Sequence, residues 1–505
     1  MIMEKQFLFL KNGTAAPLKE LPCPEFEEFR SAVIGKVNAS CRVMAFFAMP
    51  EEEKFRLIAV LGDPEKKGFE LTSTVVGSQY PALTSDAPAF HWFEQEIAEQ
   101  YGIVPVGHPW LKPLRFHRSY TGKDAWERKA DEEILPCVTD YFTMEGEASH
   151  EVAVGPVHAG VIEPGHFRFQ CMGEDVYSLE IELGYQHRGI EKMLIGGPDK
   201  KTIHFMETAA GDTTIASATN YAQIMEALGN VEVPRKSRLF RAVALELERL
   251  ANHIGDLGAL AGDVAFLPTA SFCGRIRGEY LNMTAELCGN RFGRNLVVPG
   301  GTRFGLEVVR AQKVLKWIKR VYPELQQALD LMFDSPTVLD RFENTGTVSR
   351  EDAVKAGLVG VGGRAAGVDI DARHDFPADD ISRPEKAACG TGDVISRARV
   401  RYDEIIAAHE WLIPVLEKIS DYIPDHRANV PLAAESIAVS VTEAWRGELC
   451  HAAVTDANGK FRRYKIVDPS FHNWFGLALA LRNEEISNFP ICNKSYSLSY
   501  CGHDL

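Results

Sequence analysis

The chain has 505 residues, of which 45% are hydrophobic and 25% charged, a composition typical of globular proteins with a large core. Its formal net charge of −15 argues against a nucleic-acid-binding surface, whose footprint is a basic patch. No window of about eighteen apolar residues occurs, so the sequence predicts no membrane-spanning helix. The first residues lack a basic stretch followed by an apolar core, which predicts no secretory signal and a cytoplasmic location.

Residues 1–120 are predicted to form an α+β domain. Two short runs, 42–47 and 56–61, are rich in apolar residues and predict strands. An amphipathic helix is predicted next, because large apolar side chains recur at spacings of three and four before a Gly- and Pro-containing stretch, 102–109, that stops it. The residues of this stripe are Phe90, Phe93, Ile97 and Tyr101.

Residues 121–150 are charged, show no sustained apolar periodicity and are predicted to be a linker. Beyond them, 151–505 are predicted to form a mainly α-helical bundle domain with small β excursions. Apolar residues recur every three or four positions from Leu239 to Ala261, which places them on one face of a helix of more than six turns.

Three further helices are predicted over 274–290, 305–331 and 393–422. Asp393 is expected to cap the last of them, and Pro414 to kink or end it. Two β-like runs, 449–455 and 461–467, flank an Asn-Gly pair that predicts a hairpin turn.

The cysteines are widely spaced, and no two of them are three residues apart. The sequence therefore contains no Cys-x-x-Cys motif, which is the arrangement that supplies pairs of thiolates to soft metals. Scattered free thiols in a reducing compartment are the expected state. The ten positions are Cys23, Cys41, Cys137, Cys171, Cys273, Cys288, Cys389, Cys450, Cys492 and Cys501.

A series of short motifs runs through the second module in a fixed order. They occupy 155–160 (GPVHAG), 163–166 (EPGH), 184–192 (GYQHRGIEK), 245–253, 299–301, 364–367 and 446–449. With this order and spacing, 151–505 resembles the large subunit of energy-converting membrane [NiFe] hydrogenases, of the formate hydrogenlyase and hydrogenase-4 kind, and of their respiratory complex I relatives. The segment 468–474 is more similar to the membrane hydrogenases than to complex I. Residues 91–118 resemble the smaller peripheral-arm subunit of complex I, which several membrane hydrogenases carry fused ahead of the large subunit.

The resemblance implies two nickel-binding Cys-x-x-Cys pairs that this chain lacks. The early pair is expected within 207–213, where Ala210 and Thr213 stand in place of the cysteines. The second is expected near the C-terminus, where Cys501 is only a weak candidate for a metal ligand. The quinone-binding tyrosine of complex I, expected near Ala210, is also missing. We therefore expect no Ni–Fe centre and a closer likeness to a hydrogenase-related subgroup without nickel ligands.

The resemblance also implies a candidate proton relay or acceptor cavity. Glu163 occupies the place of a proton-transferring glutamate, His166 that of a histidine that reaches the quinone head group, and Asp263 that of its acidic neighbour. A carboxylate in a partly dry pocket can have a pKa near neutrality, whereas a solvated loop carboxylate is the plainer alternative. Convergence of the three side chains would favour chemistry, and dispersal would favour a coupling scaffold.

His187 and Arg188 match residues that lie near the terminal iron–sulfur cluster of a neighbouring subunit in complex I. The alternative is a helix-start His-Arg pair bound to backbone carbonyls. The next two residues, Glu191 and Lys192, are expected to be a solvated pair.

The function implied is that of an acceptor-site subunit in a membrane-associated, complex I-like oxidoreductase. Electrons would arrive from a [4Fe-4S] cluster in a small partner subunit and drive proton or sodium translocation through antiporter-like integral membrane subunits. The chain itself would bind no cofactor, apart from a possible quinone or other small acceptor, and would lie peripherally on the cytoplasmic face of the membrane. The alternatives are a non-catalytic coupling scaffold, and an active [NiFe] hydrogenase or NADH:quinone oxidoreductase subunit.

Overall fold

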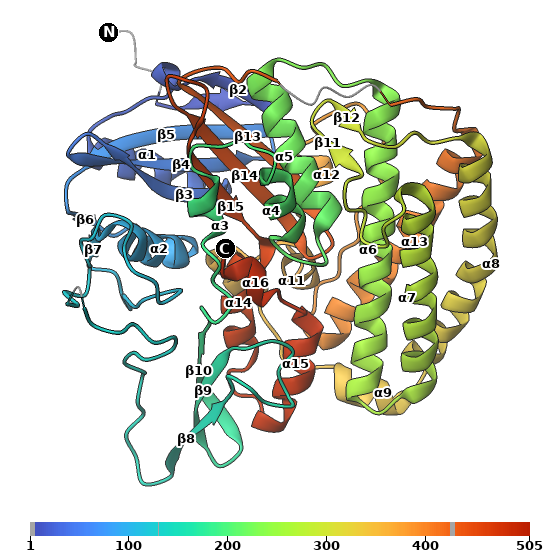
Figure 1. The fold of residues 1–505 in the computed structure, drawn as a ribbon. Helices are drawn as coiled ribbons and strands as arrows, with labels where there is room; N and C mark the ends of the chain where they lie inside the picture. Colours follow the sequence, from blue (N-terminus) through green and yellow to red (C-terminus); the bar gives the residue numbers. More distant parts are fainter. Residues whose placement is uncertain (1–5, 130, 425–429) are drawn as a thin grey trace.

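A four-stranded antiparallel sheet, ordered β1-β5-β4-β3, organises the N-terminal part of the chain (Figure 1). The computed structural model describes residues 6–129, 131–424 and 430–505. The apolar runs at 42–47 and 56–61 lie in β3 and β4, which are buried along most of their length, as predicted. The predicted amphipathic helix is α2, and it ends where Gly102 adopts the left-handed conformation with φ 67°. These elements are β1 (Leu8–Leu10), α1 (Phe26–Asn38), β3 (Arg42–Glu51), β4 (Lys54–Asp63), β5 (Gly68–Val76) and α2 (His91–Tyr101).

A second sheet joins the two ends of the sequence. It is ordered β15-β14-β13-β2, with β2 (Thr14–Pro17) antiparallel to β13 (Ser436–Ala444). The predicted hairpin at Asn458-Gly459 connects β14 (Gly447–Thr455) to β15 (Phe461–Val467). Apolar side chains of this sheet share one core with those of the N-terminal sheet. The predicted boundary at residue 120 therefore does not separate two independent cores, because β2 pairs with a strand more than 400 residues away.

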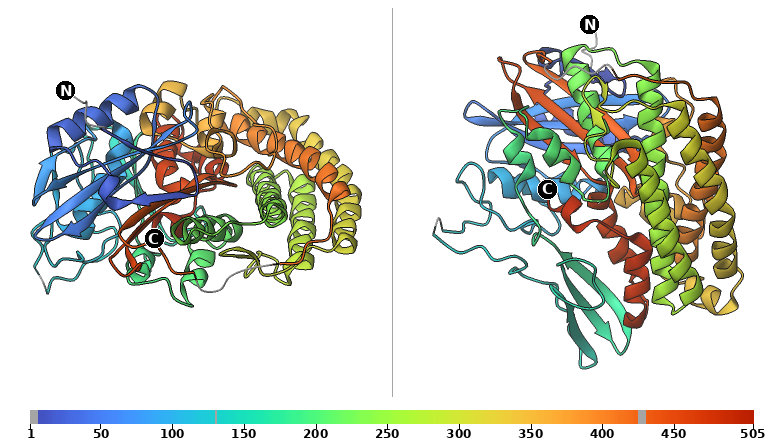
Figure 2. Two further views of the ribbon diagram at one scale, coloured as in Figure 1. Left: turned by 90° about the horizontal axis from the view of Figure 1, so that it is seen from above. Right: turned by 45° about the vertical axis from the view of Figure 1, so that its right-hand side comes forward.

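Long helices stand beside the sheets and form the second layer (Figure 2). The stripe from Leu239 to Ala261 lies in α6 and is buried, as predicted. Asp393 caps α13, since its carboxylate accepts a hydrogen bond of 3.0 Å from the backbone N–H of Ser396. The helix continues past Pro414 to Lys418. The long helices are α5 (Thr214–Gly229), α6 (Arg235–Asp263), α7 (Leu267–Cys288), α8 (Val308–Phe333) and α13 (Val394–Lys418).

A small three-stranded sheet, β10-β9-β8, projects at the lower end of the molecule in Figure 1. The segment 107–148 has no helix or strand among its described residues, and the predicted linker, 121–150, lies within it except for its last two residues, which begin β8. No helix in the described parts of the chain is both long and apolar enough to cross a membrane. The shorter elements are η1 (Leu18–Glu20), β6 (Gln79–Pro81), η2 (Pro88–Phe90), β7 (Val104–Val106), β8 (Ser149–Val154), β9 (His166–Met172), β10 (Asp175–Glu182), α3 (Ile190–Leu194), α4 (Thr202–Thr208), β11 (Val297–Val298), β12 (Gly301–Thr302), α9 (Pro336–Phe342), α10 (Arg350–Ala356), α11 (Gly360–Ala365), α12 (Ala372–Asp375), α14 (Pro469–Ala480), η3 (Ile486–Asn488), α15 (Phe489–Tyr496) and α16 (Tyr500–His503).

Candidate functional site

The C-terminal residues fold back onto the loop that precedes α3. The carboxylate of Asp504 accepts hydrogen bonds from the backbone N–H groups of Gly184 (2.9 and 2.8 Å) and Gln186 (3.0 Å). The ring Nδ1 of His187 lies 3.2 Å from the backbone oxygen of Asp504. Gly184 has φ 98°, and a Cβ there would lie 2.8 Å from the backbone oxygen of Arg115. The GYQHRG motif is therefore a tight turn that the C-terminal segment fixes.

Arg188 connects this turn to the segment where the first nickel ligands were expected. Its guanidinium donates to the backbone oxygens of Thr208 (2.8 Å) and Ala209 (2.7 Å), and more weakly to that of Cys501 (3.5 Å). These are the backbone-carbonyl contacts of the alternative interpretation. The residue is nevertheless exposed to solvent. A position near a partner's iron–sulfur cluster stays a prediction.

The two positions expected to carry the early nickel ligands are buried beside Cys501. Ala210 and Thr213 are each 2% exposed. The backbone N–H of Gly211 lies within hydrogen-bonding reach of the Cys501 sulfur. Burial raises the pKa of the Cys501 thiol despite this contact, so the thiol is held in its protonated form. The folding of the chain thus reproduces the meeting of the two segments that the resemblance implied.

The side chains at this meeting point do not fit a Ni–Fe centre. The resemblance implies four thiolates, and the matching positions supply a methyl group from Ala210, a hydroxyl from Thr213 and one thiol from Cys501. The hydroxyl of Thr213 is already 3.2 Å from the carboxylate of Asp212. Nickel and iron in such centres need soft sulfur ligands, which this set does not provide.

Glu163 lies at the same place. Its carboxylate accepts a hydrogen bond of 2.5 Å from the side-chain amide of Gln186 and is half-buried. Its charge acts on two groups of the C-terminal segment, since it contributes to raising the pKa of Tyr500 and of Cys501, in both cases after burial as the larger cause. The carboxylate predicted to relay protons is therefore held next to the altered nickel position.

His166 lies in a different environment, at the first position of β9. Its Nε2 accepts a hydrogen bond of 3.2 Å from Arg168, and its ring meets the ring of Tyr141 at 5.5 Å in an edge-on arrangement. Burial lowers the pKa of His166, and the charge of Arg168 lowers it further. The imidazole is thus neutral at pH 7, with its Nε2 already in use as an acceptor.

Asp263 is the last residue of α6, a helix of 29 residues, and it is exposed. Burial of part of the carboxyl raises the pKa of Asp263, and the nearest charge acting against this is that of Lys494. No hydrogen bond or ion pair in the described chain joins Asp263, His166 and Glu163 to one another. One polar pocket shared by the three side chains therefore stays a prediction.

Arg446 and Asp212 form an ion pair that the sequence analysis did not single out. It lies beside Ala210 and Thr213, the altered metal position. The guanidinium of Arg446 binds both carboxylate oxygens of Asp212, at 2.8 Å each, and donates to the backbone oxygen of Ser497 at 2.5 Å. The Ser497 hydroxyl in turn donates to Asp256 (2.9 Å), which also binds Arg401 (2.9 Å). The sequence offered one indication of this pair: Asp212 lies within 207–213, where the early nickel ligands were expected, and Arg446 lies in the motif 446–449.

Glu191 was expected to be a solvated partner of Lys192, and this is wrong. It is fully buried, and its carboxylate binds Arg463 (2.9 Å) and Lys465 (3.0 Å) of β15. Lys465 also binds Glu96 of α2, at 2.5 Å. The first turn of α3 points inward here, so a short helix with charged residues presents one of them to the core. The cluster ties α2, α3 and β15 together.

A second group with metal-ligand chemistry lies in the N-terminal sheet. Atoms of Cys41, Asp63 and Glu70 lie within 4.8 Å of one another and are buried. Lys36 and Lys66 both form ion pairs with Glu70, and Lys66 lies 3.7 Å from Asp63. Burial raises the pKa of the Cys41 thiol to about 11. Two ammonium groups therefore already balance the carboxylates of this group.

Two families match separate parts of the chain. Residues 263–438 match the family described as respiratory-chain NADH dehydrogenase, 49 Kd subunit. Residues 32–129 match respiratory-chain NADH dehydrogenase, 30 Kd subunit. The order of the two matches is the order of the two resemblances that the motifs indicated.

Similar proteins include formate hydrogenlyase subunit 5 of Escherichia coli, which is 29% identical over 444 residues, covering 82% of this chain and 74% of that protein. Hydrogenase-4 component G of the same organism is 28% identical over 440 residues, covering 82% and 73%. The C/D subunit of the NADH-quinone oxidoreductase of Bacteroides thetaiotaomicron is 27% identical over 379 residues, covering 69% of each protein. The predicted resemblance to both hydrogenases and complex I is confirmed.

Proposed function

Because this chain is a large subunit of the hydrogenase and complex I type, we propose that it receives electrons from a neighbouring [4Fe-4S] subunit and couples them to proton or sodium translocation without a Ni–Fe centre. The observation that carries the proposal is the altered donor set. The segment of Ala210 and Thr213 lies beside Cys501, since the backbone N–H of Gly211 acts on that thiol, and the three residues offer one thiol in place of the four that the resemblance implies. Glu163 beside them keeps an ionisable group. Proton transfer is thus the chemistry that these side chains can still perform.

The proposed partner is a small iron–sulfur subunit that covers residues 135–162, the segment ahead of β9. Large apolar side chains are exposed along this segment, which is unfavourable in water unless another protein covers them. Arg188 follows this segment in the sequence. It is also exposed, and it contacts the backbone oxygen of Cys501. Since the described helices cannot cross a membrane, we place the membrane contact in antiporter-like partner subunits and the chain at the cytoplasmic face. The exposed apolar residues are Leu135, Val138, Phe142, Val157 and Ile162.

A second candidate function is a coupling scaffold that reacts with no substrate. No hydrogen bond or ion pair among the described residues joins Glu163, His166 and Asp263, and this favours the scaffold, because a quinone or other small acceptor needs converging polar groups to orient it. In that case the altered position would only transmit conformational change between partner subunits.

The two candidates are distinguished by Glu163→Gln in the purified multi-subunit complex. The change keeps the side-chain volume and removes only the ionisable group. A carboxyl that relays protons contributes roughly two to four orders of magnitude when proton transfer limits the rate, so turnover and ion movement should fall together while the complex assembles. The acceptor is first identified by redox titration and by screening quinones and other small oxidants.

The matched control is Glu343→Gln, which makes the same substitution at an exposed position after α9. Assembly, turnover and ion movement are measured on the same preparations. Unchanged turnover and ion movement in a well-assembled Glu163→Gln complex would remove Glu163 from the mechanism and favour the scaffold. A loss of assembly alone would give Glu163 a structural role.

A further inference from the structure

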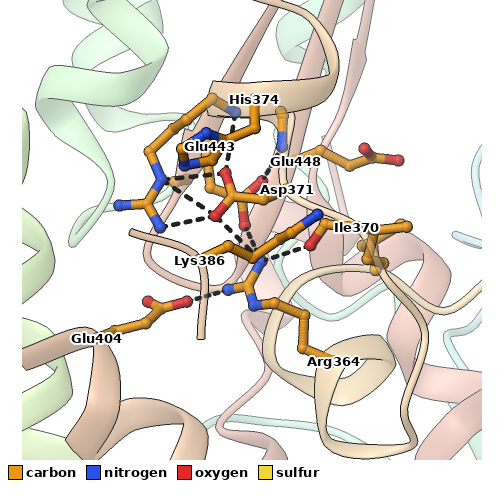
Figure 3. A network of polar contacts seen from close by, with 12 residues as sticks. Arg364, Ile370, Asp371, His374, Lys386, Glu404, Glu443 and Glu448 are labelled. Atoms are coloured by element: carbon orange, nitrogen blue, oxygen red, sulfur yellow. Dashed lines mark hydrogen bonds and ion pairs between the residues drawn. The ribbon is translucent and has the colours of Figure 1, made fainter. Parts of the chain in front are cut away.

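A buried ion cluster lies in the interior between α6, α11, α12, α13 and β13 (Figure 3). Arg364 is at its centre and forms ion pairs with Glu404 and with Glu443, the latter at 2.7 Å. Arg249 binds Glu404 from the other side, and His253 lies 2.7 Å from the same carboxylate. Every member is at most 8% exposed, so water screens these charges only weakly. The members are Glu246, Arg249, His253, Arg364, Asp371, Arg373, Glu404 and Glu443.

The permanent charges of this cluster do not cancel. Its three guanidinium groups are always positive, whereas its four carboxylates carry four negative charges when all are ionised. One negative charge then remains in a largely buried cluster, where an unpaired charge is unfavourable. One bound proton would restore neutrality. The guanidinium groups are those of Arg249, Arg364 and Arg373, and the carboxylates those of Glu246, Asp371, Glu404 and Glu443.

His253 is poorly placed to hold this proton. Its Nε2 already bonds to Glu404, and its Nδ1 is buried without a hydrogen-bond partner among the described residues. An imidazolium would therefore leave a buried N–H donor unsatisfied, which is unfavourable. Consistently, burial lowers the pKa of His253 to about 4.

Glu443 is the carboxylate of the cluster with the fewest guanidinium contacts. Asp371 is bound by two nitrogens of Arg373, and Glu404 and Glu246 are each bound by two different arginines, Glu246 at 3.3 Å from both. Glu443 has only one nitrogen of Arg364 and the backbone N–H of Ala372, at 3.0 Å. Burial raises the pKa of Glu443 to about 7, with Arg364 acting against it.

The charged groups that face Glu443 come from every element packed around it. They are Arg249 and Glu246 of α6, Arg364 of α11, Asp371 at the start of α12, Arg373 within α12, Glu404 of α13, and the Arg42–Glu448 pair of β3 and β14, in which Glu448 is the cross-strand neighbour of Glu443.

Glu443 also has a route to solvent. It lines a polar cavity of about 680 Å³ together with Arg373 and Ala372. The opposite side of the cluster continues to the altered metal position through Arg401, Asp256, Ser497, Arg446 and Asp212, each bonded to the next as described above, with Glu404 close enough to act on Arg401. A charge near that position can therefore act on the cluster along these polar contacts, the last step from Arg401 to Glu404 being electrostatic.

We propose that Glu443 is a proton-binding site of the chain, loaded from the polar cavity and emptied into it. This inference rests on the proposed function for its timing. Reduction of the partner's [4Fe-4S] cluster by one electron would add one negative charge to that cluster and favour uptake of one proton by the Glu443 carboxylate. When the cluster passes the electron to a quinone or other small oxidant, that charge would be removed and the proton released. The protein thereby converts electron arrival into a proton movement between cavity and core.

The binding of the proton is tested without turnover, by infrared titration of the purified full-length chain. A protonated carboxyl group gives a C=O stretching band that an ionised one lacks. The wild-type-minus-Glu443→Gln difference should contain such a band at low pH, and the band should disappear as the pH rises through neutrality. Glu232→Gln is the matched control, because Glu232 lines the same cavity but is exposed. The control should retain the band.

A band that persists in Glu443→Gln, or that is absent from the wild type at every pH, overturns the proposal. If Glu443→Gln does not fold, Glu443→Asp replaces it: the shorter carboxyl should shift the band, and an unshifted band is the contrary result. The titration needs no partner and no substrate, so its failure leaves the Glu163 result untouched. Equally, an inactive scaffold would still show the Glu443 band.

Discussion

Replacing Glu191 by glutamine should destabilise the chain strongly, because it removes the central anion of the cluster between α2, α3 and β15. Burial alone would raise the pKa of Glu191, but the cations of Lys465, Arg463 and Arg115 outweigh it and hold the pKa at about 2. The ordinary pKa of a glutamate is 4.5, so the difference corresponds to about 3 kcal/mol of stabilisation at neutral pH. Breaking a buried pair by removing one partner costs roughly 3–5 kcal/mol, which agrees with this magnitude.

The sign of the pH dependence follows from the lowered pKa. The contribution of Glu191 is fully present above about pH 4.5 and is lost as the pH falls toward 2, because the folded state then has to accept a proton that the unfolded state already holds. The assay is chemical denaturation of the purified chain at pH 7, followed by tryptophan fluorescence and circular dichroism. Glu174→Gln, at an exposed position in the β9–β10 turn, is the control and should change stability by less than about 0.5 kcal/mol. If Glu191→Gln lowers the free energy of unfolding by less than about 1 kcal/mol, the reasoning is refuted.

Three further predictions concern the altered site and the buried ion cluster. Elemental analysis of the purified complex should find far less than one nickel per chain, and stoichiometric nickel would contradict the interpretation of Ala210 and Thr213. Arg446→Lys should lower stability by roughly 1–3 kcal/mol in the same denaturation assay, since one ammonium cannot replace the two 2.8 Å contacts to Asp212; equal stability would contradict this. Burial raises the pKa of Glu443 from 4.5 to about 7, so the folded state holds an extra proton between these values and wild-type stability should fall as the pH rises from about 5 to about 8. Relative to Glu443→Gln the fall should be on the order of 3 kcal/mol, and parallel pH profiles for the two chains would be the contrary result.

The sequence predicted those features that local patterns determine. The stripe of Phe93 and Ile97 recurs with the helical period and forms α2, and Asp393 caps α13 because its side chain reaches a backbone N–H three residues ahead. The helix nevertheless continues beyond Pro414. A proline removes one backbone hydrogen bond of the helix. Packing of the neighbouring turns is enough to maintain the helical conformation.

The sequence could not predict contacts that only the tertiary fold selects. The bond between Asp212 and Arg446 joins residues far apart in the chain, and neither residue type signals burial. Glu191 was predicted to be solvated for the same reason. A charged residue on a short helix is usually exposed, unless the fold provides a buried partner such as Lys465. The resemblance to a family singled out Glu163, whose charge acts on Cys501, but it could not supply the separate contacts that His166 makes with Arg168 and Asp263 with Lys494.

The pairing of β2 with β13 makes the order of assembly interdependent. A chain cut between 120 and 151 would leave one fragment holding a strand without its sheet and the other a sheet with a bare edge, which is a surface prone to pairing with the wrong partner. Neither fragment would be expected to fold stably alone. The two fragments would have to associate before the exposed strand edges aggregated. Having both on one polypeptide keeps the missing strand at a high local concentration from the moment the last sheet is synthesised.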